Sequence, residues 1–355
     1  MLENRKESMK KKKIAILHSQ VPFVTGGAEL MVQALKRNLE VRGFEVEMVA
    51  IPFKWYPEQS LYDTMLAWRL LDLSEANGEK IDLVIGTKFP SYGAVHENKV
   101  IWMIQQYRQA YDLYDTDYGL SKQKNGGTIK ERVRNYDKLT VSEAKAVYTI
   151  SKNVSERLKK YTDLDSEALY QPPPLVGQYK KGEPGDYICA VGRLDKLKRN
   201  ELLINALPYC DKHIKVKLAG RGPEMENLIS LVKHLNVQDR VEFLGFVPDS
   251  ALIDLYANSR GVFFAPVDED YGFITLEAFL SGKPVITCDD TGGVLEFVDH
   301  DINGFVCKAE AAAIGESINK LWNDKKIGGS MGENGYQKVK DINWDNVIRK
   351  LTVLL

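Results

Sequence analysis

The stretch GVFFAPVDEDYGFITLEAFLSGKPVIT, residues 261–287, carries the strongest indication of the fold. An apolar run over 261–265 is typical of a buried strand. A helical pattern follows from Thr275 to Leu280 and stops at Gly282, and residues 284–287 form a second apolar run. A strand, a helix and another strand in this order predict two parallel strands joined by a crossover helix.

The same alternation runs through the rest of the chain. A strand is predicted over 13–17, and a helical pattern from Ala28 to Leu39 ends at Gly43. Further short apolar strands are predicted at 45–51, 82–86, 100–104, 146–150, 187–191, 215–219 and 241–244. Apolar strands that alternate with helices are typical of parallel sheets covered on both faces, so we predict the α/β class.

A break in this alternation divides the chain. Three consecutive prolines follow Gln171, and glycines and another proline continue to Gly185. Such a run favours extended backbone and cannot continue a helix. We therefore predict a linker here, with a first domain over 13–175, a second over 176–341, and a disordered basic leader over 1–12. Two domains agree with 355 residues, at about 100–200 residues per domain.

The composition argues against several classes of protein. The 48 Lys and Arg nearly balance the 49 Asp and Glu, so the chain has no global field for nucleic acid, and we expect none as a partner. The four cysteines form no CxxC pair, which argues against a zinc cluster and a disulfide framework. No apolar run approaches the roughly 20 residues of a transmembrane helix, and no signal peptide is apparent. A cytoplasmic protein is the expectation.

The charge is unevenly distributed along the chain. Residues 1–177 carry a net charge of +3 and the remainder −4, and 11 basic against 4 acidic residues lie between Lys122 and Lys160. Such a run is most often a solvated helix face. The alternative is a patch on the first domain that contacts anionic membrane lipid or an acidic acceptor.

Two glutamates flank the start of the helix in the opening stretch. Glu269 lies in the loop after the strand, and Glu277 lies eight positions further on, in the helix. Gly272 between them allows the backbone to approach a ligand at the helix N-terminus, where free N–H groups favour an anion. The arrangement can hold a phosphate while the carboxylates accept hydroxyl hydrogen bonds, and a sugar nucleotide supplies both. Two glutamates alone are equally typical of ordinary surface acids on a helix.

Further motifs follow other predicted strands. Arg193 and Lys198 come after strand 187–191 and place two cations just past its end. The sequences GRG at 220–222 and GFV at 245–247 follow the next two strands, and a glycine pair at 26–27 precedes the first predicted helix.

In this order the motifs resemble glycosyltransferase family 4, the retaining, metal-independent GT-B transferases that use nucleotide-sugar donors. The pattern of that family has a glycine-rich first loop, an Arg and a Lys after the first strand of the second domain, and a Glu-x7-Glu element. The resemblance covers nearly the whole chain. It implies two Rossmann-like domains facing each other across a cleft, the first on the acceptor side, and a C-terminal helix over about 342–355 that packs back on the first domain.

The resemblance also implies roles for the motif residues. Arg193 and Lys198 would neutralise the diphosphate and stabilise the leaving nucleotide without a metal. Glu269 would accept hydrogen bonds from the donor sugar, and Glu277 from the ribose. The other positions would present backbone to the donor or lie near its base, and they are Gly26, Gly27, Gly192, Gly220, Gly222, Phe246, Val247, Tyr271, Gly272, Phe273 and Ile274.

One position departs from the family pattern. After the strand over 100–104, many members have a histidine that contacts donor sugar and acceptor, and here Gln105 takes its place. Gln105 can donate and accept hydrogen bonds but cannot carry a proton at neutral pH. Because retaining transfer is commonly pictured as same-face attack assisted by the leaving phosphate, Gln105 could still orient a hydroxyl. The alternative is a plain polar loop residue.

Two other features have weaker functional interpretations. His18, after the first strand, could face the ligand, but a loop histidine with satisfied hydrogen bonds is as typical. Asp289 and Asp290 are adjacent acids without further metal ligands, so no metal is expected.

We therefore predict a hexosyltransferase-type enzyme of polysaccharide biosynthesis. It would move a sugar from a nucleoside diphosphate sugar, a co-substrate rather than a bound cofactor, to a glycan, lipid-linked or small-molecule acceptor. One alternative is a related GT-B sugar-nucleotide epimerase, hydrolase or phosphorylase. Another is an inactive homologue retained as a binding subunit, an alternative suggested by Gln105 in place of the family's histidine. The sequence leaves the base and the sugar open.

Overall fold

The computed structural model describes residues 10–24 and 26–355, and the chain divides into two compact units. Unit 1 comprises the chain up to Gln171 together with Trp344–Leu355, and unit 2 comprises Pro172–Asn343. The boundary falls inside the proline-rich segment at 171–185. Residues 1–9 of the predicted leader lie outside the described residues.

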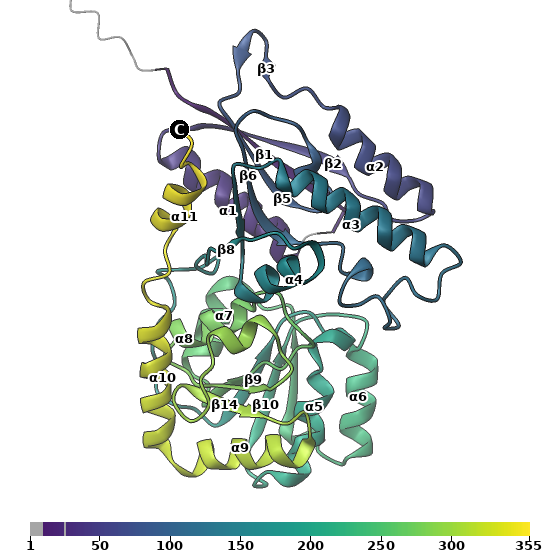
Figure 1. Ribbon diagram of the computed structural model, residues 1–355. Coiled ribbons are helices and arrows are strands. Elements are labelled where there is room, and N and C mark those ends of the chain that lie inside the picture. Colours follow the sequence, from purple (N-terminus) through teal and green to yellow (C-terminus); the bar gives the residue numbers. More distant parts are fainter. Residues whose placement is uncertain (1–9, 25) are drawn as a thin grey trace, which may run out of the picture. The chain divides into compact units, whose positions relative to one another are not determined.

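Unit 1 is built on a parallel sheet. Its strands are β1 Lys13–Gln20, β2 Glu45–Pro52, β5 Leu83–Lys88, β6 Lys99–Gln105, β7 Ala146–Thr149 and β8 Glu167–Ala168. They lie in the order β2-β1-β5-β6-β7-β8 and pair in parallel, as the continuous apolar runs predict. A short antiparallel hairpin, β3 Glu75–Ala76 and β4 Glu79–Lys80, stands apart from this sheet (Figure 1).

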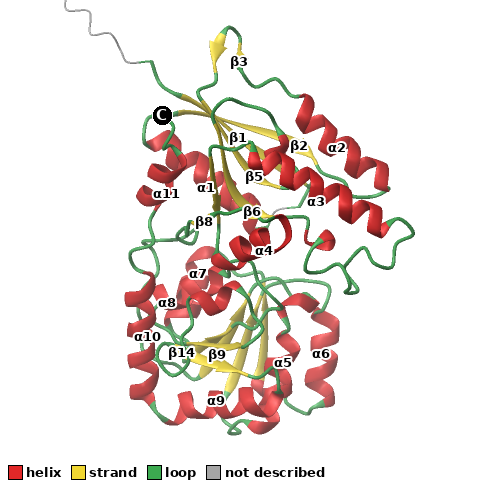
Figure 2. Cartoon of the chain, in the orientation of Figure 1, coloured by secondary structure: helices red, strands yellow, loops and turns green. Residues whose placement is uncertain are grey.

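Helices cover the unit 1 sheet (Figure 2). They are α1 Gly27–Val41, α2 Glu58–Leu70, α3 Gly126–Ser142, α4 Lys152–Thr162 and α11 Trp344–Leu351, with the short turns η1 Ser91–Gly93 and η2 Arg108–Ala110. Trp68 of α2 packs in one apolar cluster with Leu17 of β1. The rings of Trp102 in β6 and Trp344 in α11 meet edge-on, 6.1 Å apart. This contact anchors the C-terminal helix within unit 1.

Unit 2 repeats the architecture with a second parallel sheet. Its strands are β9 Tyr187–Val191, β10 Lys215–Ala219, β11 Val241–Gly245, β12 Gly261–Phe263, β13 Val285–Cys288 and β14 Gly304–Cys307. Their order is β11-β10-β9-β12-β13-β14. The order reverses between β9 and β12, which pair directly although β10 and β11 lie between them in the sequence.

The helices of unit 2 lie on both faces of its sheet (Figure 2). They are α5 Asn200–Ala206, α6 Met225–His234, α7 Asp249–Ala257, α8 Phe273–Leu280, α9 Ala311–Asn323 and α10 Lys325–Val339. Short turns join them, namely η3 Lys196–Lys198, η4 Leu207–Tyr209, η5 Gln238–Arg240 and η6 Gly293–Glu296. The main core lies between the sheet and α5, α6 and α9, where Leu203, Leu228 and Ile318 pack against Ile188 and Val216. No helix of the described chain is long and apolar enough to cross a bilayer.

All four cysteines are buried in unit 2 as free thiols: Cys189, Cys210, Cys288 and Cys307. Burial raises the pKa of Cys189 and of Cys288 to about 12 and that of Cys210 to about 11. The thiols therefore act as small apolar groups of the core.

Candidate functional site

The predicted cations and acids gather at the carboxyl edge of the unit 2 sheet. The loops after β9 and β12 start from neighbouring strands and carry Arg193, Lys198 and Glu269. The strand order reverses here, and loops that diverge at such a point leave room for a ligand in open α/β sheets. This edge is therefore the candidate functional site.

An ion pair joins the two loops. The Lys198 ammonium contacts the Glu269 carboxylate, and it lies 5.4 Å from the ring centroid of Phe264. Lys198 ends η3, which Asp195 caps by accepting a hydrogen bond from the Lys198 amide at 3.2 Å. Both charged side chains are mostly buried. The site thus holds a lysine and a glutamate together before any ligand binds.

The loop that carries Glu269 is fixed by its neighbours. The Glu269 amide donates to the Thr291 carbonyl at 3.1 Å, and its carbonyl accepts from the Gly293 amide at 2.7 Å. Arg199 binds both Asp290 oxygens, at 2.6 and 2.7 Å, and donates to the Ala265 carbonyl at 2.8 Å. These contacts give the carboxylate of Glu269 a defined position.

The adjacent acids Asp289 and Asp290 both form ion pairs with basic side chains. Asp290 binds Arg199, which holds the pKa of Asp290 below its usual range, and Asp289 pairs with Lys308. Among the described residues, no group of three His, Cys, Asp or Glu side chains is placed to hold a metal ion.

Arg193 is held more loosely than Lys198. Its side chain is 67% exposed, and its Nε lies 3.6 Å from the Asp195 carboxylate. Gly192 before it has φ +125°, and a Cβ there would lie 3.2 Å from Ile274 of α8. The loop after β9 therefore passes close to the first turn of α8 and projects Arg193 into solvent.

The N-terminus of α8 depends on Gly272. Its φ is +82°, and a Cβ would lie 3.0 Å from Val294 and 3.1 Å from Phe264, so only glycine fits. This turn brings the amides of Phe273 and Ile274 to the first turn of α8, where backbone donors have no partner within the helix. Tyr271 is buried and its ring packs on aromatic neighbours, so it would offer the ligand its backbone.

Glu277 lies deeper than the sequence suggested. It is 9% exposed, and the hydroxyl of Tyr256 in α7 donates to its carboxylate at 2.7 Å. Burial raises the pKa of Glu277, and the hydrogen bond from Tyr256 opposes that shift. Sequence reasoning missed Tyr256, because 21 residues separate the partners and no spacing rule links them.

The glycines after β10 have a packing requirement. A Cβ at Gly220 would lie 1.8 Å from the Gly192 carbonyl, and one at Gly222 would lie 2.1 Å from the Leu194 carbonyl. The loops after β9 and β10 therefore touch through their backbones. Phe246 is 70% exposed after β11, where it and Val247 border a shallow cavity of about 380 Å³.

The predicted positions of unit 1 lie at the carboxyl edge of its own sheet. The Gly26 amide donates to the Glu29 carboxylate at 2.8 Å, at the start of α1. Glu29 also contacts Lys88 at 2.8 Å and lies 3.5 Å from the His18 ring. Burial raises the pKa of Glu29, but the neighbouring His18 and Lys88 outweigh it and hold the pKa well below its usual range.

This buried cluster was only partly visible in the sequence. Glu29 stands three residues after Gly26, which is a capping-box position and could have been noticed. Lys88 is the last residue of β5, and no sequence motif indicated a role for it. The Thr87 hydroxyl donates to the Leu17 carbonyl at 2.7 Å, so its oxygen accepts from His18 Nδ1 at 3.1 Å.

Gln105 ends β6 with an exposed side chain. Gln106 after it is buried, and within the described chain neither its amide nitrogen nor its amide oxygen has a hydrogen-bond partner. The buried amide is thus one position beyond the residue aligned with the family's histidine.

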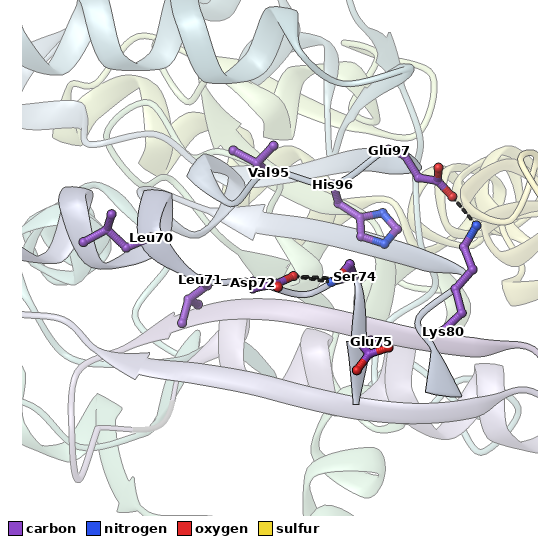
Figure 3. Close-up of a pocket in the computed structure, with 9 residues that line it drawn as sticks. All are labelled: Leu70, Leu71, Asp72, Ser74, Glu75, Lys80, Val95, His96 and Glu97. Carbon is purple, nitrogen blue, oxygen red and sulfur yellow. Dashed lines mark hydrogen bonds and ion pairs between the residues drawn. The ribbon is translucent and has the colours of Figure 1, made fainter. Parts of the chain in front are cut away.

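A cavity of about 680 Å³ in unit 1 lies apart from all these residues, between the end of α2 and the β3–β4 hairpin. Figure 3 shows that its polar groups bind one another: Lys80 pairs with Glu97, and the Asp72 carboxylate accepts from the Ser74 amide at 2.9 Å. None of the predicted site residues lines it. We do not assign it to the functional site.

Comparison with known proteins finds a family match in the second half of the chain. Residues 175–338 match the family described as Glycosyl transferases group 1. The N-acetyl-alpha-D-glucosaminyl L-malate synthase of Bacillus anthracis is 22% identical over 347 residues, which are 92% of this chain and 86% of that protein. An uncharacterized glycosyltransferase of Methanocaldococcus jannaschii is 32% identical over 167 residues, 46% of this chain and 43% of that protein. The chain thus spans less than half the length of this second relative.

A solved structure matches nearly the whole chain. The Anabaena protein HepE, in complex with UDP and glucose, aligns with a TM-score of 0.69 at 18% identity, over 96% of this chain and 98% of HepE. This likeness confirms the predicted fold class, the α/β GT-B fold with two parallel six-stranded sheets.

Proposed function

We propose that the protein is a retaining, family 4 glycosyltransferase that moves a sugar from a nucleoside diphosphate sugar to an acceptor. The observation that carries the proposal is the Lys198–Glu269 ion pair beside the N-terminus of α8. The family match and the names of the relatives support transfer over the epimerase, hydrolase, phosphorylase and binding-subunit alternatives. HepE was solved with UDP and glucose, which supports a nucleotide-sugar donor.

In this proposal the cations act on the leaving group. The diphosphate binds between the α8 amides and the ammonium of Lys198, while the exposed Arg193 folds onto it from solvent. As the bond to the anomeric carbon breaks, negative charge develops on the diphosphate, and the two cations stabilise it without a metal. EDTA should therefore leave the rate unchanged.

The carboxylates bind the sugar and the ribose. When the diphosphate engages Lys198, Glu269 becomes available to accept hydrogen bonds from the sugar hydroxyls. Glu277 accepts one hydrogen bond from Tyr256, and a carboxylate can accept up to about four, so it has capacity for a ribose hydroxyl. The acceptor hydroxyl attacks from the face that the nucleotide leaves, which retains the anomeric configuration.

The test begins with the donor. UDP, GDP, ADP and dTDP, followed by their sugars, are screened for thermal stabilisation, because a ligand that binds the native state raises the melting temperature. The best donor is then incubated with glycan, lipid-linked and small-molecule acceptors, and products are analysed by mass spectrometry. Lys198→Ala, Arg193→Ala and Glu269→Ala should each lower the transfer rate by about 10²–10³.

Lys196→Ala is the matched control, since Lys196 is an exposed cation in the same turn as Lys198, and it should transfer at the wild-type rate. Wild-type rates in the three site variants would overturn the site assignment. Free sugar, an isomerised donor or a sugar 1-phosphate as the sole product would overturn transfer. An inverted product would overturn retention alone.

The basic segment adds a proposal about the acceptor. Part of its charge is used internally, since Arg157 pairs with Asp112. Lys124, Lys138 and the 57%-exposed Leu139 remain on the surface. We propose that this face contacts anionic lipid and brings a lipid-linked acceptor within reach. Sedimentation with vesicles that does not depend on anionic lipid or on salt would overturn it.

A further inference from the structure

A cavity at the amino edge of the unit 2 sheet is lined by basic side chains that have no role in the proposed transfer. Its volume is about 190 Å³. Arg260 lies immediately before β12, Lys283 lies two residues before β13, and the first turns of α10 contribute Lys325. Because the strands are parallel, this edge lies about one strand length, roughly 15 Å, from the edge that carries Lys198.

The guanidinium of Arg260 is buried without an acceptor. Arg260 is 6% exposed and stacks 4.8 Å from the ring centroid of Trp322. Its Nε and Nη1 are enclosed, and in the described part of the chain neither has a hydrogen-bond partner. An arginine stays charged in proteins, and a buried charged donor left without an acceptor is costly. The arrangement therefore points to an anionic ligand.

Lys283 adds a second buried cation. It is 3% exposed, and its ammonium donates to the Gly182 carbonyl at 2.7 Å. Burial lowers its pKa to about 8, and the nearby charge of Arg260 acts in the same direction. At neutral pH the group is still predominantly protonated, and an ammonium has three donors.

The charge of the lining is strongly positive. Among the described lining residues, four are basic (Lys181, Arg260, Lys283 and Lys325) and one, Glu333, is acidic, so the net charge is 4 − 1 = +3. Glu333 already binds Lys181 at 2.6 Å. A guanidinium fork beside an ammonium suits a tetrahedral oxyanion, and the excess charge favours a dianion over a carboxylate.

We propose that Arg260 and Lys283 form a phosphate-binding site separate from the donor site. The cavity equals about six water volumes, which accommodates a phosphoryl group with a small substituent but not a nucleotide sugar. The ligand is therefore inorganic phosphate or a small phosphomonoester. Bound phosphate would join the starts of β12 and β13 to α10, and would stabilise unit 2.

The test uses the full-length protein with inorganic phosphate or methyl phosphate at constant ionic strength. Calorimetric titration of the wild type should give saturable binding, and the tighter of the two probes identifies the source of the phosphoryl group. Arg260→Gln should weaken binding at least tenfold, and Lys325→Gln, an exposed change that does not threaten folding, should weaken it severalfold. Lys326→Gln is the matched control, because Lys326 is exposed on α10 but does not line the cavity.

The experiment must also distinguish phosphate binding at this cavity from phosphate binding at the proposed donor site. Arg193→Ala should bind phosphate as the wild type does, and saturating UDP should not displace it. Retained affinity in both Arg260→Gln and Lys325→Gln, or lost affinity in Arg193→Ala, would overturn the proposal. Circular dichroism checks that Arg260→Gln folds, and Lys325→Gln carries the test if it does not. Sugar transfer is not measured here, so failure of the proposed function and failure of this site are distinguishable.

Discussion

Asp137 offers a quantitative test of the interior of unit 1. It lies in α3, fully buried, and accepts hydrogen bonds from the hydroxyls of Tyr92 at 2.8 Å and Tyr111 at 2.7 Å. Burial raises its pKa to about 7, and the two hydrogen bonds only partly oppose that shift. Asp137→Asn keeps the shape of the side chain and removes its titration.

The expected effect follows from linkage. The folded state binds the proton more tightly than the unfolded state, where an aspartic acid titrates at about 3.9. The resulting stabilisation is fully present below that value and is lost as pH rises through 7. Each pH unit between the two pKa values changes the free energy of unfolding by about 1.4 kcal/mol. From pH 5 to pH 8 the wild type should lose about 2–3 kcal/mol that Asp137→Asn does not lose.

The assay is urea denaturation at pH 5, 6, 7 and 8. Unit 1 holds Trp55, Trp68, Trp102 and Trp344, whereas unit 2 holds Trp322 alone, so tryptophan fluorescence mainly follows unit 1. Asp115→Asn, an exposed change in the same unit, should keep the wild-type pH dependence. Parallel curves for the wild type and Asp137→Asn would refute the reasoning.

Three further predictions concern the site and its surroundings. Gly272→Ala forces a methyl group into a left-handed turn at a cost of about 1–2 kcal/mol, and nucleotide titration should show weaker binding; unchanged affinity would contradict it. Glu29→Gln leaves the mostly buried Lys88 without its carboxylate, so urea denaturation should show a loss of about 3 kcal/mol, against little change for the exposed Glu40→Gln. Lys283 has its pKa lowered to about 8, so the folded state releases its proton first and stability rises with pH above that value. The wild type should gain about 2 kcal/mol relative to Lys283→Met between pH 7 and 9.5, and equal slopes would argue against it.

The sequence predicted the elements that have strong local signals. The strands over 187–191 and 215–219 coincide with β9 and β10, because each is an apolar run bounded by polar or turn residues. The strand predicted over 261–265 pairs as β12 only to Phe263, since Arg199 draws the following carbonyls away from the sheet. The strand β14 was not predicted.

The sequence predicted which residues belong to the candidate site, but it did not predict the contacts between them. Lys198 and Glu269 were both named, but 71 residues separate them, and only the fold shows that they form an ion pair. The Glu29–Lys88 contact spans 59 residues and has no motif. The remaining differences concern burial. Gln105 is exposed, whereas Gln106 and Glu277 are buried. The sequence alone does not reveal which of two neighbouring side chains faces inward.

The uneven placement of cysteine gives the protein a chemical probe of its own. The four thiols lie in unit 2 and none lies in unit 1. A buried thiol with a raised pKa reacts with an alkylating reagent only when the surrounding structure opens. Alkylation rates followed by mass spectrometry therefore report the opening of unit 2 alone, without any introduced label. A donor that binds this unit should slow every one of these reactions, and peptide mapping would show which strands it protects most.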